Sequence, residues 1–386
     1  MNKSILATSL LCALSGIASA QSSVTLYGVL DAGVSYMRID GEYLRDRNNV
    51  GMAYGTQSGN RLGLKGVEDL GSGNKLTFVL ENGFDLGNGT TEQNSRIFGR
   101  QAWFGVENEV WGYARMGRQY NFATDYFGAI DPFMLGFGQA SMGAAFGTTN
   151  MDRLSNAVKY QTPSFHGFQA GLGYSFAVGE TAFYNNSGAT PNAYGTTAYN
   201  YESANNNRQI TLGAKYVSGP IYIAASYDKL IGTNAPVNAS ETNPSAWNLG
   251  ASYDFNVAKL ALAYGQSRGG NIRGQGDGMT GPNEGNNPYW GSNGGLLYFN
   301  QSFDSNAYLV GVTVPVNQAS RVFASWTLAT ISQGNNAANQ SAYNIGYSYD
   351  FTKRTNMYAY FSYMNNLNNT DTNKSTGVGV GVRHMF

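Results

Sequence analysis

The sequence predicts an all-β chain that forms a 16-stranded antiparallel transmembrane β-barrel. Three observations carry this prediction. Apolar and polar residues alternate along strand-length segments, and short and long connections alternate between those segments. Charged residues form only 12% of the chain, against roughly 25% in typical soluble domains. A hydropathy scan does not reveal such a barrel, because half of each strand faces a polar interior.

The first twenty residues have the three parts of a signal peptide. Lys3 supplies the positive charge, residues 5–14 are apolar, and Ala18-Ser19-Ala20 is an A-x-A cleavage site. The apolar run is too short to span a bilayer. We therefore expect cleavage near Ala20 and a barrel domain over residues 21–386. The single cysteine, Cys12, lies in the removed part, so the mature chain can hold no disulfide or thiolate metal site.

The first and last strands show the alternation most clearly. Residues 24–36 alternate with a period of two, and so do residues 376–386, which place valines on one face and glycines on the other. A chain that ends inside a strand must pair that strand with another. We expect the last strand to pair with the first and close the barrel.

Connections between the segments fall into two classes. Seven short turns carry Gly, Pro, Asn or Asp and lie near 71–73, 108–112, 163–167, 218–220, 254–258, 315–320 and 350–355. Eight longer polar stretches lie near 39–57, 87–95, 119–152, 179–207, 231–245, 268–304, 331–340 and 365–375. Fifteen connections join sixteen strands, and barrels of this size enclose an aqueous channel. Tyrosines and phenylalanines near the turns suit an aromatic girdle, although aromatics also favour strands in general.

Alternation also orients the basic residues of the early strands. In the second strand Leu62 and Leu64 share the lipid face, so Arg61 and Lys65 should point into the barrel. An arginine facing lipid near the membrane midplane would cost roughly 2–4 kcal/mol, which supports this orientation.

The same argument applies to two further strands. If Trp103 faces lipid, Arg96 and Arg100 face inward; if Met116 faces lipid, Arg115 faces inward. Neighbouring strands would then carry a basic patch on the inner wall. The alternative is that these charges are only hydrated by the water of the interior and have no functional role.

The long connection at 119–152 is rich in aromatic residues, which a solvent-facing loop would not need. Its acids Asp125 and Asp131 could oppose the basic wall, and apposed charges tune ion selectivity. The alternative, that both acids cap turns inside the loop, has equal support.

Six segments resemble Gram-negative general-diffusion porins, above all the β-proteobacterial group. They are SVTLYG at 23–28, RLGLKGVEDLG at 61–71, GRQAWFG at 99–105, GRQY at 117–120, RLSNAVKY at 153–160 and VGVRHMF at 380–386. The resemblance covers nearly the whole mature chain. It implies a homotrimer of sixteen-stranded barrels in the outer membrane, each narrowed by an inward-folded third external loop.

The resemblance also implies roles for particular residues. Arg61, Arg100 and Arg153 would form the arginine cluster of the constriction. Further candidates for its basic wall are Lys65, Arg96, Arg115 and Arg118. Val29 departs from some enteric porins, which have lysine there, so the basic wall could be thinner at that level. The terminal Phe386 resembles the signal by which the barrel assembly machinery recognises its clients.

The expected function is a water-filled channel in outer-membrane lipid for passive diffusion of ions and small hydrophilic solutes, with a weak anion preference. No cofactor, metal or catalytic site is expected, since the chain has only two histidines. The balanced charge, 24 basic and 24 acidic residues, gives no indication of nucleic acid. The alternatives are a selective channel for a sugar or organic acid, a loop-mediated adhesin and, least supported, an outer-membrane enzyme.

Overall fold

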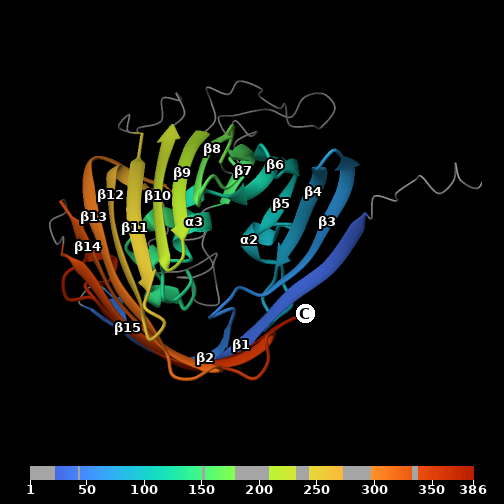
Figure 1. Ribbon diagram of the computed structural model, residues 1–386. Coiled ribbons are helices and arrows are strands. Elements are labelled where there is room, and N and C mark those ends of the chain that lie inside the picture. Colours follow the sequence, from blue (N-terminus) through green and yellow to red (C-terminus); the bar gives the residue numbers. More distant parts are fainter. Residues whose placement is uncertain are drawn as a thin grey trace, which may run out of the picture.

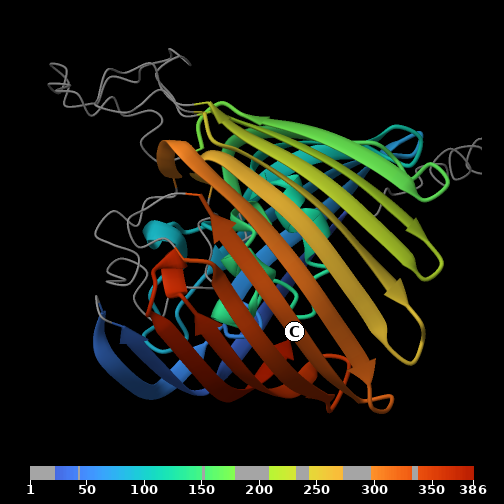
Figure 2. The same cartoon turned by 90° about the vertical axis from the view of Figure 1, so that its left-hand side faces the viewer.

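The computed structural model describes residues 22–41, 44–149, 153–178, 208–231, 243–272, 297–332 and 338–386. The expected signal peptide, residues 1–20, lies outside these ranges. All strands of the described part belong to one antiparallel sheet that closes on itself (Figure 1). The strands cross the wall obliquely (Figure 2), as closure of a sheet into a barrel requires.

The sheet contains seventeen strand segments. They are β1 (Ser23–Gly41), β2 (Leu44–Tyr54), β3 (Arg61–Gly71), β4 (Asn74–Gly83), β5 (Gln101–Asn108), β6 (Gly112–Tyr120), β7 (Arg153–Gln161), β8 (Phe168–Ser175), β9 (Arg208–Ser218), β10 (Ile221–Ile231), β11 (Ser245–Asp254), β12 (Lys259–Ile272), β13 (Leu297–Pro315), β14 (Ser320–Ile331), β15 (Gln340–Asp350), β16 (Thr355–Asn365) and β17 (Lys374–Met385).

These seventeen segments form sixteen barrel strands, because β2 and β3 are two parts of one strand. The first part of β1, Ser23 to Val29, pairs with β3, and its later part, from Ala32 onward, pairs with β2. Residues 55–60 interrupt the second barrel strand between them. The predicted strand number is therefore confirmed. The long loop predicted at 39–57 was wrong, because most of its backbone groups are paired in the β1–β2 hairpin instead.

The barrel closes where the sequence indicated. β17 pairs with β1 from Val29↔Met385 to Asp40↔Lys374. At the end of the seam, Gly28 and Phe386 exchange two backbone hydrogen bonds of 3.1 Å. The prediction that the last strand pairs with the first is confirmed.

The two faces of the wall differ in composition. The outer face exposes large apolar side chains, among them Leu62, Leu64, Phe104, Met116, Val158, Leu172, Leu212, Leu249, Leu262, Val310, Ile345, Phe361 and Val380. The inner face carries small polar residues such as Ser226, Asn248, Ser325, Asn344 and Ser362, which are buried. This is the alternation expected of a barrel in lipid with a polar interior.

Trp103 is an exception to the expected orientation. It is buried, with the guanidinium of Arg115 4.2 Å from its ring centre, while Phe104 faces outward. The prediction that Trp103 faces lipid was therefore wrong. Arg100 precedes the start of β5 at Gln101, so strand alternation does not extend back to it.

The connection between β6 and β7 lies inside the ring of strands (Figure 1). It contains α3 (Phe122–Phe127) and the 3-10 turns η1 (Gly138–Ala140), η2 (Met142–Ala144) and η3 (Gly147–Thr149). Two other short helical segments, α2 (Glu92–Ser95) and η6 (Leu367–Asn369), lie in other connections. Among the described residues, no helix is long and apolar enough to cross a membrane.

Small residues on the wall make room for this β6–β7 loop, which we define as residues 121–149. A Cβ on Gly213 would lie 2.6 Å from the Cβ of Phe122, and one on Gly171 would lie 2.2 Å from its ring. Ala224, Ala261 and other small wall residues pack in the same buried cluster as Phe122. The loop therefore binds the wall through an apolar core of its own.

The seam yields a testable prediction. A Cβ on Gly28 would lie 2.3 Å from Cζ of Phe386 and 2.9 Å from the carbonyl oxygen of Arg61. Gly28→Ala should therefore lower the free energy of unfolding by about 1–3 kcal/mol through overpacking. Gly51→Ala in the neighbouring β2 is the control, because its nearest neighbour would be 3.8 Å away. Urea unfolding in lipid vesicles measures both, and equal stability of the two variants would refute the closure contact.

Candidate functional site

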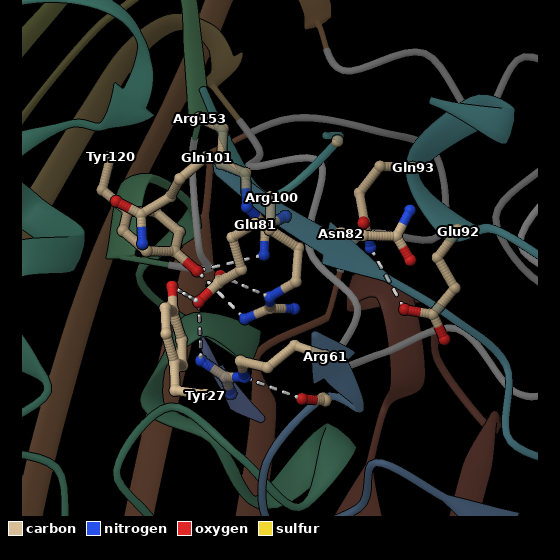
Figure 3. A network of polar contacts seen from close by, with 12 residues as sticks. Tyr27, Arg61, Glu81, Asn82, Glu92, Gln93, Arg100, Gln101, Tyr120 and Arg153 are labelled. Carbon is tan, nitrogen blue, oxygen red and sulfur yellow. Dashed lines mark hydrogen bonds and ion pairs between the residues drawn. The ribbon is translucent and has the colours of Figure 1, made fainter. Parts of the chain in front are cut away.

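Six side chains from neighbouring strands meet in one polar network on the inner wall (Figure 3). They are Tyr27 of β1, Arg61 of β3, Glu81 of β4, Arg100 just before β5, Tyr120 of β6 and Arg153 of β7. The network contains three cations and one anion. We refer to these six residues as the arginine cluster.

Glu81 lies at the centre of the arginine cluster. Its Oε1 accepts a hydrogen bond of 2.9 Å from Nε of Arg100, and its Oε2 accepts one of 2.9 Å from the hydroxyl of Tyr27. Nη1 of Arg61 lies 4.0 Å from Oε2. A buried carboxylate needs such donors, since an unpaired one would be very costly.

Tyr120 joins the other two arginines. Its hydroxyl oxygen accepts hydrogen bonds of 3.1 Å from Nη2 of Arg100 and of Arg153. Arg100 and Arg153 are fully buried, whereas the side chain of Arg61 is 21% exposed. Arg61 is thus the cation of the cluster that meets solvent, and the other two add positive charge behind it.

The structure brings together the three arginines named from the family resemblance. Glu81 and Tyr120 were not among the predicted site residues. Glu81 lies on the same face of β4 as the buried Thr77, but only the register, in which it pairs with Gly63 and Gln101, brings it beside the arginines.

The other predicted cations lie elsewhere on the wall. Arg115 stacks on Trp103 and on Tyr113, with 3.9 Å to the second ring centre, and lies 3.7 Å from Glu107. Arg118 is buried and donates hydrogen bonds of 2.7 Å to the carbonyl of Gly99 and to the hydroxyl of Ser155.

Lys65 and Arg96 complete this set. Nζ of Lys65 lies 5.5 Å from the ring centre of Tyr27, at the edge of the arginine cluster. Arg96 is the residue that ends α2. Among the predicted basic residues, three arginines therefore share one network, and Arg115 and Arg118 contact other partners.

Asp125 of α3 faces a lysine rather than the arginine cluster. Its Oδ2 accepts from Nζ of Lys159, which also donates a hydrogen bond of 2.8 Å to the carbonyl of Tyr120. The Asp125 side chain is 32% exposed. Lys159 was not predicted as a site residue, because only the β6–β7 loop places it beside an acid.

Asp131 lies inside the β6–β7 loop and does not face the pore. Its Oδ1 accepts the backbone N–H of Phe133, and its Oδ2 accepts those of Leu135 and Met142, each at 3.0 Å. Burial raises the pKa of Asp131 to about 6, although these hydrogen bonds oppose the shift. The placement agrees with the alternative interpretation of Asp131 as a cap within the loop.

The arrangement of charges suits control of ion passage more than catalysis of a reaction. Fixed charges of both signs lie on the inner wall and on the loop packed against it, and such charges bias which ions pass. The described residues contain no group of three or more His, Cys, Asp or Glu that could hold a metal ion.

Comparison with known proteins agrees with this geometry. A family model described as Gram-negative porin matches residues 7–369. An outer membrane porin protein of Bordetella pertussis is 41% identical over 397 residues, with 100% of both chains covered. Outer membrane porin protein 32 of Delftia acidovorans is 28% identical over 414 residues, again with 100% of both chains covered.

A solved structure shows the same fold. The anion-selective porin from Comamonas acidovorans superposes with a TM-score of 0.71 at 24% identity, covering 95% of this chain and 100% of that one. Family, architecture and relatives agree, and the chain belongs to the Gram-negative porins, which form channels in the cell outer membrane.

Proposed function

We propose that this porin is a general-diffusion channel in which small hydrophilic solutes and ions move down their gradients, with a weak preference for anions. The carrying observation is the arginine cluster, in which three guanidinium groups lie together around the carboxylate of Glu81 and Arg61 reaches solvent. The structurally similar porin from Comamonas acidovorans is anion-selective, which supports the same sign of preference here.

The positions of the charges explain the sign of the preference. Arg61 contacts solvent, while Arg100 and Arg153 act from within the wall, where salt screens them less than it screens surface charges. Asp125, the acid on the facing loop, is offset locally by Lys159. The cluster therefore presents the positive charge of Arg61 to the pore, which favours anions.

A selective channel for an organic acid is the second candidate. Two cations of the inner wall lie over aromatic rings: Arg115 over Trp103 and Tyr113, and Lys215 over Tyr126 of α3 at 4.8 Å. Such pairs could hold a planar anion. Conductance that saturates with one class of organic acid, but not with chloride, would favour this function over general diffusion.

We further propose that the chain acts as a homotrimer without catalytic activity and is inserted by the barrel assembly machinery through the strand ending at Phe386. Support comes from the family and from the outward position of Phe386 beside Gly28. Mass measurement of the detergent complex tests the trimer. The adhesin alternative depends on residues 268–304, of which 273–296 lie outside the described ranges.

Removing two cations tests the anion preference. Arg61→Ala combined with Arg100→Ala should shift the zero-current potential in a KCl gradient toward cations. A unit charge about 4 Å from an ion in water changes its energy by about 1 kcal/mol, so the permeability ratio should change about fivefold. The control is Lys353→Ala with Arg354→Ala, which removes the same charge from an exposed turn. An unchanged potential in the first variant would exclude a role of the arginine cluster in selectivity.

Removing the central anion should have the opposite effect. Glu81→Gln leaves a side chain that can still accept from Arg100 but deletes the negative charge, so anion permeability should rise. Glu107→Gln is matched in chemistry but pairs with Arg115, outside the arginine cluster. Planar-bilayer recordings compare the two variants. A shift toward cations in Glu81→Gln would contradict the assignment.

A further inference from the structure

Residues 55–60, which interrupt the second barrel strand, turn into the interior rather than outward. We call them the β2–β3 segment. Gln57 and Asn60 are buried, although a break in the wall could equally project into lipid or solvent. Their partners lie on the seam of the barrel and on the β6–β7 loop, as follows.

Asp31 of β1 binds the β2–β3 segment along its length. Its Oδ2 accepts the backbone N–H groups of Gln57 and Ser58, each at 2.7 Å. Its own N–H donates to Oδ1 of Asn60 at 2.6 Å, and its carbonyl accepts from the N–H of Gly55 at 2.9 Å. One fully buried residue therefore fixes both ends and the middle of the segment.

The strands of the seam hold the same segment from the other side. Tyr358 of β16 donates a hydrogen bond of 2.6 Å to Oδ1 of Asp31. Asn356 donates to Oε1 of Gln57 at 2.9 Å, and Nη1 of Arg383 on β17 donates to the hydroxyl of Ser58 at 3.1 Å. The β2–β3 segment is thus bound to β1, β16 and β17, which are consecutive around the barrel.

The β2–β3 segment also contacts the tip of the β6–β7 loop, which we define as residues 134–137. The N–H of Phe137 donates to the carbonyl of Thr56 at 2.5 Å. At Gly136 the two backbones approach so closely that a Cβ would lie 2.3 Å from the carbonyl oxygen of Gln57. Only glycine at 136 allows this approach.

The tip itself has a backbone conformation that needs external support. Phe137 has a φ of +63°, and the preceding Met134 and Leu135 have +52° and +60°, values that cost energy for residues other than glycine. The ring of Phe137 packs against Phe323 and Tyr358, with centroid distances of 5.6 and 5.2 Å. Asp131 accepts hydrogen bonds from amides on both sides of this turn and so holds them together.

We propose that the β2–β3 segment is a second inward-folded element whose role is to position the tip of the β6–β7 loop. Asp31 and Gly136 are positioning residues in this scheme. The width of the pore then depends on the barrel seam, whereas its ion preference depends on the arginine cluster. The two meet at Arg61, whose Nε donates a hydrogen bond of 2.9 Å to the carbonyl of Gly59. The proposal concerns width and stays open to test whatever the selectivity measurements give.

Gly136→Ala is the sharpest test, because it changes only the contact between the two inward elements. The added Cβ must push the tip away from Gln57. Single-channel recordings should show a broader distribution of conductance and several-fold more frequent partial closures, with the zero-current potential unchanged. Gly128→Ala is the control in the same loop, since its Cβ would lie 3.6 Å from its nearest neighbour and its φ is −58°.

Asp31→Asn and Tyr358→Phe test the hydrogen bonds that hold the β2–β3 segment in place. Both keep side-chain shape and remove hydrogen bonds that the Asp31 carboxylate accepts, so both should increase closures, with Asp31→Asn the stronger. The heat-dependent gel mobility of the folded barrel shows whether each variant has assembled. If Asp31→Asn does not assemble, Gly136→Ala decides alone, because it lies outside the wall. Conductance and closure frequency like those of Gly128→Ala would overturn the proposal.

Discussion

Closure of the hydrogen-bonded ring is the constraint on which the rest of this structure depends. In the hydrocarbon of a bilayer a backbone amide has no water to bind, so every strand needs a partner on both sides. Here the last strand, β17, completes the ring by pairing with β1. Sixteen strands make an interior too wide for wall side chains to fill. Narrowing this interior therefore requires additional chain inside the barrel.

That additional chain must be held without a continuous core. The β6–β7 loop brings its own aromatics, and the wall accommodates them with glycine and alanine where they press against it. Elsewhere polar bonds hold the loop: Gln139 donates to Ser362, and Gln340 donates to the carbonyl of Ala144. The interior thus combines apolar contacts on one side with amide and hydroxyl contacts on the other.

Sequence reasoning succeeded where a single strand carries the information. The outward Leu62 and Leu64, the strand number and the closing pair all follow from alternation and turn chemistry. It failed where two distant strands must be aligned. Trp103 was misplaced because this large aromatic was assigned to lipid, whereas its ring packs against Arg115 of the neighbouring strand. Glu81 and Lys159 were missed because their partners lie on other strands or on the loop. The role of Asp131 depends on a loop conformation that no periodicity encodes.

The position of Asp31 has a consequence for the order of assembly. Its partners are residues 55–60, early in the chain, and Tyr358, near its end. Contacts of such long sequence separation form late, after the entropy of closing the intervening chain has been overcome. The support of the β6–β7 loop tip is therefore completed only when β16 and β17 reach β1. A nascent barrel that has not yet closed exposes an unpaired strand edge and also lacks the finished narrow passage, so closure and narrowing of the pore belong to the same step.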